Sequence, residues 1–267
     1  MTLERIGAQD AETFPVLALM SWHTQLPQFF TVVAINRMSD RYFSTDAIEG
    51  STAMLTGSEA HHLLHVMRAS PGLRVVLFDG RGGEFSAEVA HCGRAEIELN
   101  LGPRCEVERE LPFELILAVP LPKGDRQRWL VEKAVELGVT RLVPLKTART
   151  ERSRDDVAVK LRRYVIEASK QCGRNRLMEI APAIEWAELL SETIKRRYVA
   201  HPEGRPQAEV FSGAATDAIL AVGPEGGLTG DEIEQAIQAD WEVVALGERI
   251  LRVETAALAL IAQYQMA

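Results

Sequence analysis

The sequence predicts an α/β protein in which a small strand-rich domain precedes a larger parallel sheet. After residue 112, short apolar segments alternate with amphipathic segments of helical period, the pattern of a parallel sheet covered by helices on both faces. Between residues 41 and 108, strand patterns dominate around one short helix, which indicates a small β-barrel or sheet. The 267 residues, 46% of them apolar, suit two modest domains or one large one and allow a sizeable core.

Residues 1–37 fit neither pattern. They show no sustained helical or strand period and contain prolines at positions 15 and 27. We therefore expect an N-terminal extension that is poorly ordered, with the compact body starting near Met38. An added strand over residues 31–35 is the alternative interpretation.

The first domain is predicted to span residues 38–108. Residues 56–68 form a short helix, with Thr56 or Ser58 as its N-cap. Residues 74–90 form two strands joined by a glycine-rich turn, and residues 95–101 alternate apolar and polar as a half-buried strand does. The polar, turn-rich segment 102–112 is the candidate linker to the second domain, which is predicted to span residues 109–267.

The second domain opens with an apolar strand and an amphipathic helix. The strand covers residues 114–120. The helix covers residues 124–138 and is expected to bury Trp129, Leu130, Ala134 and Leu137, with Gly138 ending it. The remaining predicted elements are a strand at 139–145, a helix at 155–171, strands at 197–201, 218–224 and 242–246, and helices at 230–239 and 252–265.

The net charge of −8 argues against a nucleic-acid partner, but the charge is unevenly distributed. Residues 123–176 contain fifteen Lys/Arg and seven Asp/Glu, so this tract is basic within an acidic chain. Such a tract suits one polyanion contact, and a set of solvated helix faces would look the same.

The cysteines and the hydropathy point to the cytoplasm. Cys92, Cys105 and Cys172 are far apart, odd in number and outside any CxxC pair, as expected of reduced thiols. No apolar run approaches the roughly 18 residues that span a bilayer, and the N-terminus lacks the pattern of a signal peptide.

Two segments are candidate ligand loops, because each runs from an apolar strand through glycine into a helix. The first, AVGPEGGLT at 221–229, lacks the lysine of a phosphate-binding Walker loop, and neither segment has the GxGxxG of a dinucleotide site. Glu225 disfavours a pyrophosphate and suits a ligand with a cationic head and a flat ring, such as S-adenosylmethionine. A simple turn into a helix capped by Thr229 remains the alternative.

The second segment, ALGERILRVETAALAL at 245–260, places Arg249 and Arg252 around two apolar residues. Glu254 and Thr255 then open a helix that is nearly all apolar, so this helix should be buried, within the core or at a subunit interface. An ordinary capped core helix is the alternative.

The run HHLLH invites a metal interpretation, because His61 and His65 are spaced i, i+4. It lacks the glutamate of HExxH and any clear third ligand, so we expect no metal and interpret these histidines as surface or packing residues.

Together, VGPEGGLT and, some twenty residues later, LGERILRVETAALAL resemble the RsmE family. These knotted SPOUT-class enzymes methylate N3 of a uridine in 16S ribosomal RNA of the small ribosomal subunit. Other segments agree, namely RYF at 41–43, GSEAHHLLHVMR, LFDGRGGEFSAEV, LPKGDRQRWLVEKAVELGVTRLVPL and EASKQCGRNRLMEI. The similarity covers roughly residues 40–265.

The resemblance implies a SPOUT-type parallel sheet with a C-terminal trefoil knot, preceded by a PUA-like RNA-binding barrel, working as a homodimer. It also implies an S-adenosylmethionine site in the knot loops. Carried over by motif, the cofactor-binding residues are Val222, Gly223, Pro224, Gly226, Gly227, Leu246, Gly247, Ile250 and Leu251.

On this reading, Glu225, Asn175, Arg249 and Arg252 are the candidate catalytic residues. They would act on the N3 proton, on the developing oxyanion or on the uracil edge. The predicted contacts to RNA are Arg41, Lys146, Arg149, Arg152, Arg154, Arg162, Arg163 and Arg174, with an ion pair at the barrel edge as the alternative for Arg41.

Three alternative functions stay open. A related SPOUT enzyme acting on transfer RNA or on a ribose 2′-hydroxyl has the same cofactor loops. A non-catalytic RNA-binding factor would not need them, and a nucleotide hydrolase lacks its phosphate-loop lysine here.

Overall fold

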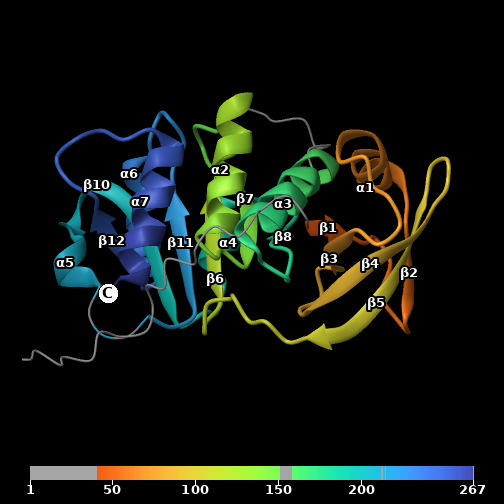
Figure 1. Ribbon diagram of the computed structural model, residues 1–267. Coiled ribbons are helices and arrows are strands. Elements are labelled where there is room, and N and C mark those ends of the chain that lie inside the picture. Colours follow the sequence, from red (N-terminus) through yellow and green to blue (C-terminus); the bar gives the residue numbers. More distant parts are fainter. Residues whose placement is uncertain (1–40, 151–157, 212, 214, 267) are drawn as a thin grey trace, which may run out of the picture. The chain divides into compact units, whose positions relative to one another are not determined.

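The computed structural model describes residues 41–150, 158–211, 213 and 215–266 (Figure 1). The predicted N-terminal extension lies outside the described residues. Within them, no helix is both long and apolar enough to cross a membrane. The strands form two sheets, one before and one after residue 110.

The first sheet has five strands in the order β1-β3-β4-β5-β2. Adjacent strands pair antiparallel except β1 and β3, which run parallel. The elements are β1 (Arg41–Phe43), β2 (Thr52–Leu55), the helix α1 (Gly57–His61) with a π-helical turn (His62–Val66), β3 (Arg74–Phe78), β4 (Glu84–Cys92) and β5 (Ile97–Cys105).

This arrangement confirms the hairpin predicted from the glycine-rich turn and the half-buried strand predicted at 95–101. Alternate residues of β3, β4 and β5 face a core that Leu63 of the helical segment completes. Thr56 occupies the N-cap position of α1, but its side chain makes no capping hydrogen bond.

The second sheet has seven parallel strands in the order β12-β10-β11-β6-β7-β8, with β9 also paired to β7. Its strands are β6 (Leu115–Val119), β7 (Arg141–Lys146), β8 (Glu179–Ile180), β9 (Ile184–Glu185), β10 (Arg196–Pro206), β11 (Ala218–Val222) and β12 (Glu242–Ala245). Every residue of β6 and β11 is buried, as expected of central parallel strands.

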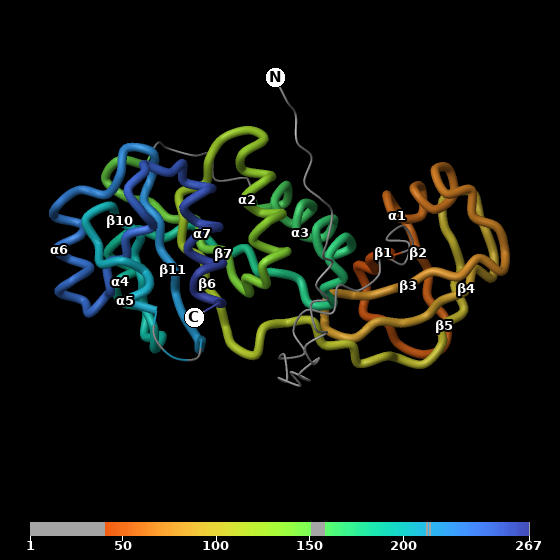
Figure 2. Tube along the Cα trace, turned by 60° about the vertical axis from the view of Figure 1, so that its left-hand side comes forward, coloured from red at the N-terminus to blue at the C-terminus, as the bar shows by residue number. Residues whose placement is uncertain are grey.

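Helices cover both faces of this sheet, as the sequence predicted (Figure 1 and Figure 2). One core contains residues from α2, α3, α7 and one face of the central strands, and a second core contains residues from α4, α6 and the other face. The helices are α2 (Asp125–Glu136), α3 (Ala158–Cys172), α4 (Trp186–Leu190), α5 (Gln207–Val210), α6 (Gly230–Gln238) and α7 (Val253–Gln265).

The predicted inner face of α2 is correct except at Trp129. Leu130 and Ala134 are fully buried, and Leu137 packs against the same core. Trp129, which was expected to be buried, is 43% exposed, whereas Gln127, which was not, is buried. Gly138 follows the helix with a φ of +79°, a left-handed conformation that suits glycine after a helix end.

The C-terminal helix returns from the sheet edge to the centre. β12 is the edge strand, yet α7 packs against β11, β6 and α2. This return path is compatible with the knot that the resemblance implies, and the knot itself stays a prediction. α7 is largely buried, as predicted from its apolar sequence.

Candidate active site

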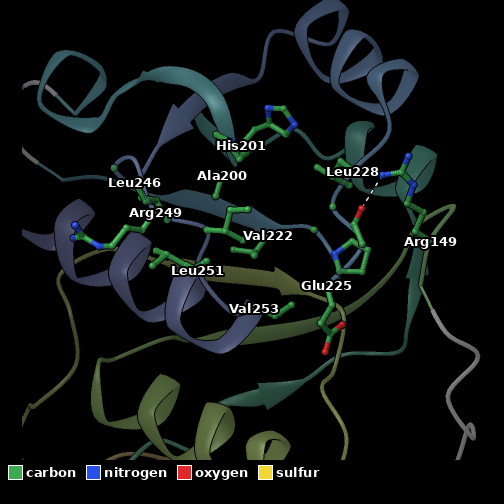
Figure 3. A pocket seen from close by; sticks show the side chains of 18 residues that line it. Arg149, Ala200, His201, Val222, Glu225, Leu228, Leu246, Arg249, Leu251 and Val253 are labelled. Atoms are coloured by element: carbon green, nitrogen blue, oxygen red, sulfur yellow. Dashed lines mark hydrogen bonds between the residues drawn. The ribbon is translucent and has the colours of Figure 1, made fainter.

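A cavity of about 390 Å³ lies at the carboxyl ends of β11 and β12, beside residues 200–202 of β10 (Figure 3). In open α/β sheets, ligands bind at this edge, and the volume is within the range of small-molecule sites. The two predicted ligand loops both line the cavity, and every residue predicted to hold the cofactor is among the lining residues. Cofactor binding by these residues stays a prediction.

The first loop is a tight turn between β11 and α6. The amide of Gly227 donates to the carbonyl of Pro224 at 2.8 Å, and Gly227 has a φ of +71°. Thr229 caps α6 through a capping box, in which the Thr229 hydroxyl accepts from the amide of Glu232 at 3.2 Å and the Glu232 carboxylate accepts from the amide of Thr229 at 2.8 Å. The cap predicted from the sequence therefore exists, and it anchors a cavity wall.

The second loop connects β12 to α7. Gly247 has a φ of +115°, where a side chain would be strained, and no atom lies within 4 Å of the position that its Cβ would take. Arg249 lines the cavity with an exposed side chain, and Leu251 lies between it and Val253 of α7 (Figure 3). Arg252 is exposed at the N-cap position of α7 and does not line the cavity.

A third segment, which the sequence reasoning missed, completes the lining. Ala200, His201 and Pro202 belong to β10, where the register against β12 shifts after Ala200. The signal was present, because RYVAHPEG is also an apolar strand that runs into polar residues and glycine. Since β10 lies between β11 and β12, its residues beyond the pairing with β11 reach the same cavity.

Arg149 closes one end of the cavity. Its guanidinium donates to the carbonyl of Gly226 at 2.7 Å (Figure 3), and its aliphatic carbons lie against the same glycine. The loop that carries Arg149 is itself tied down, because the amide of Ala148 donates to the buried carboxylate of Glu232 at 2.8 Å. Glu232 therefore holds both the β7 loop and the β11 turn.

Opposite charges meet beside the turn. Nη1 of Arg126, from the first turn of α2, lies 3.4 Å from Glu225 and 3.9 Å from Glu254. The side chain of Glu225 is 56% exposed, so its carboxylate can meet a ligand, whereas that of Glu254 is 8% exposed. Arg126 was not predicted as a site residue, because its relation to Glu225 depends on the packing of α2.

Asn175, predicted to be catalytic, does not line this cavity. It is buried, and its amide oxygen accepts from Arg41 at 2.5 Å. Both of its amide donors are used, one by Glu84 at 3.2 Å and one by the carbonyl of Val107 at 3.2 Å. The structure therefore places Asn175 in a polar junction between the two sheets.

Arg41, predicted to contact RNA, belongs to the same junction. Its guanidinium lies 2.6 Å from the Glu84 carboxylate, so the alternative of an ion pair describes it better. Burial of Glu84 favours a higher pKa, but hydrogen bonds from Arg109 and Arg41 outweigh it and hold the pKa below its ordinary value.

Arg174, also predicted to contact RNA, is buried and cannot do so as it stands. Its guanidinium pairs with both carboxylate oxygens of Glu110 and donates to the carbonyls of Val135 and Val139 at 3.0 and 2.8 Å. Each of its three nitrogens donates to an acceptor within the protein, so the role of Arg174 is structural and the predicted RNA contact is wrong.

The other predicted RNA contacts are accessible where the structure describes them. Arg162 and Arg163 are exposed on α3, and Lys146 is half-exposed, 3.7 Å from Glu185. Arg152 and Arg154 lie outside the described residues. RNA binding by these side chains stays a prediction.

Neither the histidines of the HHLLH run nor Cys172 lines the cavity. The rings of His61 and His65 lie 4.6 Å apart, and the described residues contain no group of three or more potential ligands that could hold a metal. Burial raises the pKa of the Cys172 thiol, which lowers its reactivity.

Comparison with known proteins identifies the family. The model of an RNA methyltransferase domain matches residues 109–265, and that of an RNA methyltransferase PUA domain matches residues 55–101. The ribosomal RNA small subunit methyltransferase E of Bacillus subtilis is 31% identical over 225 residues, which cover 79% of this chain and 88% of that protein.

Solved structures agree. The methyltransferase E of Neisseria gonorrhoeae, bound to S-adenosylmethionine, is 29% identical with a TM-score of 0.78, over 85% of this chain and 97% of that one. A Legionella pneumophila structure, described as a methyltransferase with bound cofactor SAM, is 26% identical with a TM-score of 0.79, over 85% of this chain and 96% of that one. The chain therefore belongs to the family of ribosomal RNA small subunit methyltransferase E, with an N-terminal PUA-like domain and a parallel-sheet methyltransferase domain.

Proposed function

We propose that this protein transfers a methyl group from S-adenosylmethionine to N3 of a uridine in the 16S RNA of the small ribosomal subunit. The observation that carries the proposal is the convergence of two strand-end loops and residues 200–202 of β10 on one cavity, in a chain whose relatives include a structure bound to S-adenosylmethionine and carry the name of a ribosomal RNA methyltransferase. The homodimer and the cytoplasmic location expected from the sequence belong to the same proposal.

The residues of the cavity fit this cofactor. Val222, Leu228, Leu246, Leu251 and Val253 supply apolar walls for a flat ring. The glycines of both loops leave main-chain amides and carbonyls accessible at close range. The lining includes one carboxylate, that of Glu225, and two guanidinium groups, those of Arg149 and Arg249, so it offers charged partners both for the sulfonium and for the carboxylate of this cofactor.

When bound, S-adenosylmethionine supplies an electrophilic methyl group on a sulfonium. The protein has to hold uracil N3 in line with the S–CH₃ bond, and much of the rate can come from that positioning. N3 loses its proton and forms the N–CH₃ bond, while the S–CH₃ bond breaks and its electron pair stays on sulfur. Because N3 lies on the pairing edge, the base has to be unpaired or flipped out.

The described side chains divide these tasks. Glu225 has an exposed carboxylate at the cavity edge and can accept or orient the N3 proton. Arg249 lies at the cavity mouth and can stabilise charge on a uracil oxygen. Arg252, exposed beside the cavity, is suited to a backbone phosphate. Asn175 has no amide donor left for a base.

A direct test uses small ribosomal subunits from a strain that lacks the gene. The purified protein is incubated with them and labelled S-adenosylmethionine, and the RNA is digested to nucleosides for mass spectrometry. We expect labelled N3-methyluridine in the RNA and micromolar or tighter cofactor binding in a separate calorimetric titration. The matched control is Glu225→Gln, which keeps the shape of the side chain and should bind cofactor but turn over slowly.

Other products would favour the alternatives. A label on a ribose or on another base would reject the uridine-N3 assignment and keep the enzyme class. Cofactor binding without transfer to any RNA tested would reject the ribosomal substrate. Absence of cofactor binding would favour an RNA-binding factor.

A further inference from the structure

The segment QCGRNR at 171–176 does not line the cavity. Its last arginine, Arg176, indicates a second site. Residues 175–177 pair with the turn between β3 and β4. The amide of Gly82 donates to the carbonyl of Asn175 at 2.9 Å, and the amide of Leu177 donates to the carbonyl of Gly80 at 3.3 Å. These two bonds flank an isolated antiparallel bridge between Arg81 and Arg176. One arginine belongs to the PUA-like domain and the other to the methyltransferase domain.

This pairing places two arginines directly opposite each other. In an antiparallel pair whose hydrogen bonds come from the flanking residues, the Cα atoms are about 4.5 Å apart and the side chains project on the same face. Like charges directly opposite each other in such a pair destabilise it. Both arginines are exposed, and among the described residues neither side chain has an ion pair with a carboxylate.

The β3–β4 turn accommodates arginine side chains, since two of its glycines leave room for them. An added Cβ on Gly82 would lie 3.0 Å from the guanidinium carbon of Arg176, and one on Gly83 would lie 2.6 Å from Nε of Arg104. Arg104 also donates to the carbonyl of Gly82 at 2.6 Å. A side chain at either glycine would displace a guanidinium, so the sequence DGRGGE suits a turn that carries cations.

Among the described residues, the nearby carboxylates form no ion pair with Arg81 or Arg176. Glu84 is shared by Arg41 and Arg109, and Glu106 pairs with Arg104. Asp79 accepts from main-chain amides of Ile48 and Arg81. Arg81 and Arg176 therefore remain as a net positive pair in a chain of net charge −8.

We propose that Arg81 and Arg176 together bind one backbone phosphodiester of the substrate RNA, with one guanidinium from each domain. A phosphate between them turns the like-charge repulsion into two charge-assisted hydrogen bonds, and guanidinium groups match phosphate oxygens well. The contact spans the PUA-like and methyltransferase domains, so it fixes bound RNA relative to both. This inference rests on the proposed function, because it takes RNA as the substrate.

The test measures affinity for a 16S RNA transcript by fluorescence anisotropy between 0.1 and 0.5 M salt. Each phosphate contact contributes about 0.7 to 0.9 to the slope of log K against log salt. For R81Q/R176Q we expect the slope to fall by about one unit and the affinity at 0.15 M salt to fall about five-fold. Each single variant should show most of this loss, because one phosphate needs both arginines.

Two controls separate binding from structure. Arg94→Gln removes the same charge from an exposed position after the other end of β4 and should leave the slope unchanged. In the free protein, R81Q and R176Q should melt at or above the wild-type temperature, because each relieves repulsion. A structural role for the pair predicts the opposite sign. Cofactor affinity should stay within two-fold, since neither residue lines the cavity.

The failures are distinguishable. Wild-type protein that binds neither the transcript nor the assembled small subunit would overturn both the proposed function and this inference. Wild-type protein that binds and methylates RNA, with a double variant of unchanged slope, would overturn the inference alone. An unchanged affinity for the transcript with a reduced affinity for the assembled subunit would assign the pair to an acidic protein surface instead, and the phosphodiester would be wrong.

Discussion

Replacing Arg174 with methionine tests whether this arginine stabilises the fold, as its burial indicates, or contacts RNA, as the sequence predicted. The change removes a guanidinium that pairs with the Glu110 carboxylate and donates to two main-chain carbonyls. The side chains of Arg174 and Glu110 are only 4% and 11% exposed, so Glu110 would be left as a nearly buried, unpaired charge. Breaking a buried ion pair in this way costs about 3–5 kcal/mol.

The expected effect is a large loss of stability without a loss of RNA contact. At about 2–4 °C for each kcal/mol in a protein of this size, the melting temperature should fall by about 6–20 °C. A second variant, R174M with Glu110→Leu, replaces both charges by apolar groups and should recover most of the loss. Thermal unfolding followed by circular dichroism measures both, and RNA anisotropy well below the melting temperature measures the salt slope.

Two results would refute this reasoning. R174M that melts within about 2 °C of the wild type would show that the pair contributes little to stability. A salt slope that falls by about one unit in folded R174M would show that Arg174 contacts a phosphate after all.

Three further predictions concern the anchor of the cavity, the junction and the thiols. Glu232→Ala should raise the Kd for S-adenosylmethionine about five-fold in calorimetry, because cofactor binding would then include a free-energy cost of about 1 kcal/mol for ordering the two loops that Glu232 holds. The control Glu234→Ala, at an exposed position on the same helix, should leave the Kd unchanged. Because the folded-state pKa of Glu84 is lowered, its stabilisation is complete above the ordinary value of 4.5 and is lost as the pH falls through the lower folded value. Urea unfolding from pH 6 to pH 3 should therefore show a steeper stability loss in the wild type than in Glu84→Gln, and equal slopes would contradict the assignment. In iodoacetamide labelling at pH 7.5 read by mass spectrometry, exposed Cys105 should react before Cys172, whose thiol pKa is raised by burial, and the reverse order would be evidence against that environment.

Most of the cavity could be predicted from the sequence, because each predicted wall is one continuous segment of the chain. The two walls that were predicted each consist of a strand, a glycine-containing turn and a helix start, and each can be recognised within about ten residues. The capping box shows this best, since Thr229 and Glu232 stand three residues apart and satisfy each other's amides. Where such a segment was overlooked, as with His201, the information was local and available.

The phase of α2 was less predictable. A period of 3.6 residues identifies the helix but allows the buried stripe to be placed about one residue off, and hydrophobicity then favours Trp129 over Gln127. The structure chooses Gln127 because the inner stripe is fixed by Leu130, Val131 and Ala134 against the sheet. Tertiary packing, which the sequence of one helix does not contain, decides between the two.

The segment QCGRNR was the hardest to interpret from sequence, because three successive residues have three different environments. Arg174 turns inward to Glu110, Asn175 turns to the junction with Glu84, and Arg176 faces solvent opposite Arg81. Each partner lies more than sixty residues away along the chain. From sequence alone, the three look like one polar loop near a catalytic centre. Their separate roles follow only from the pairing of residues 175–177 with the β3–β4 turn, which brings an element of the methyltransferase sheet against the PUA-like sheet. If that pairing positions RNA as we propose, then loosening it should impair methyl transfer to RNA while cofactor affinity is unchanged, because the cavity and the junction share no side chain.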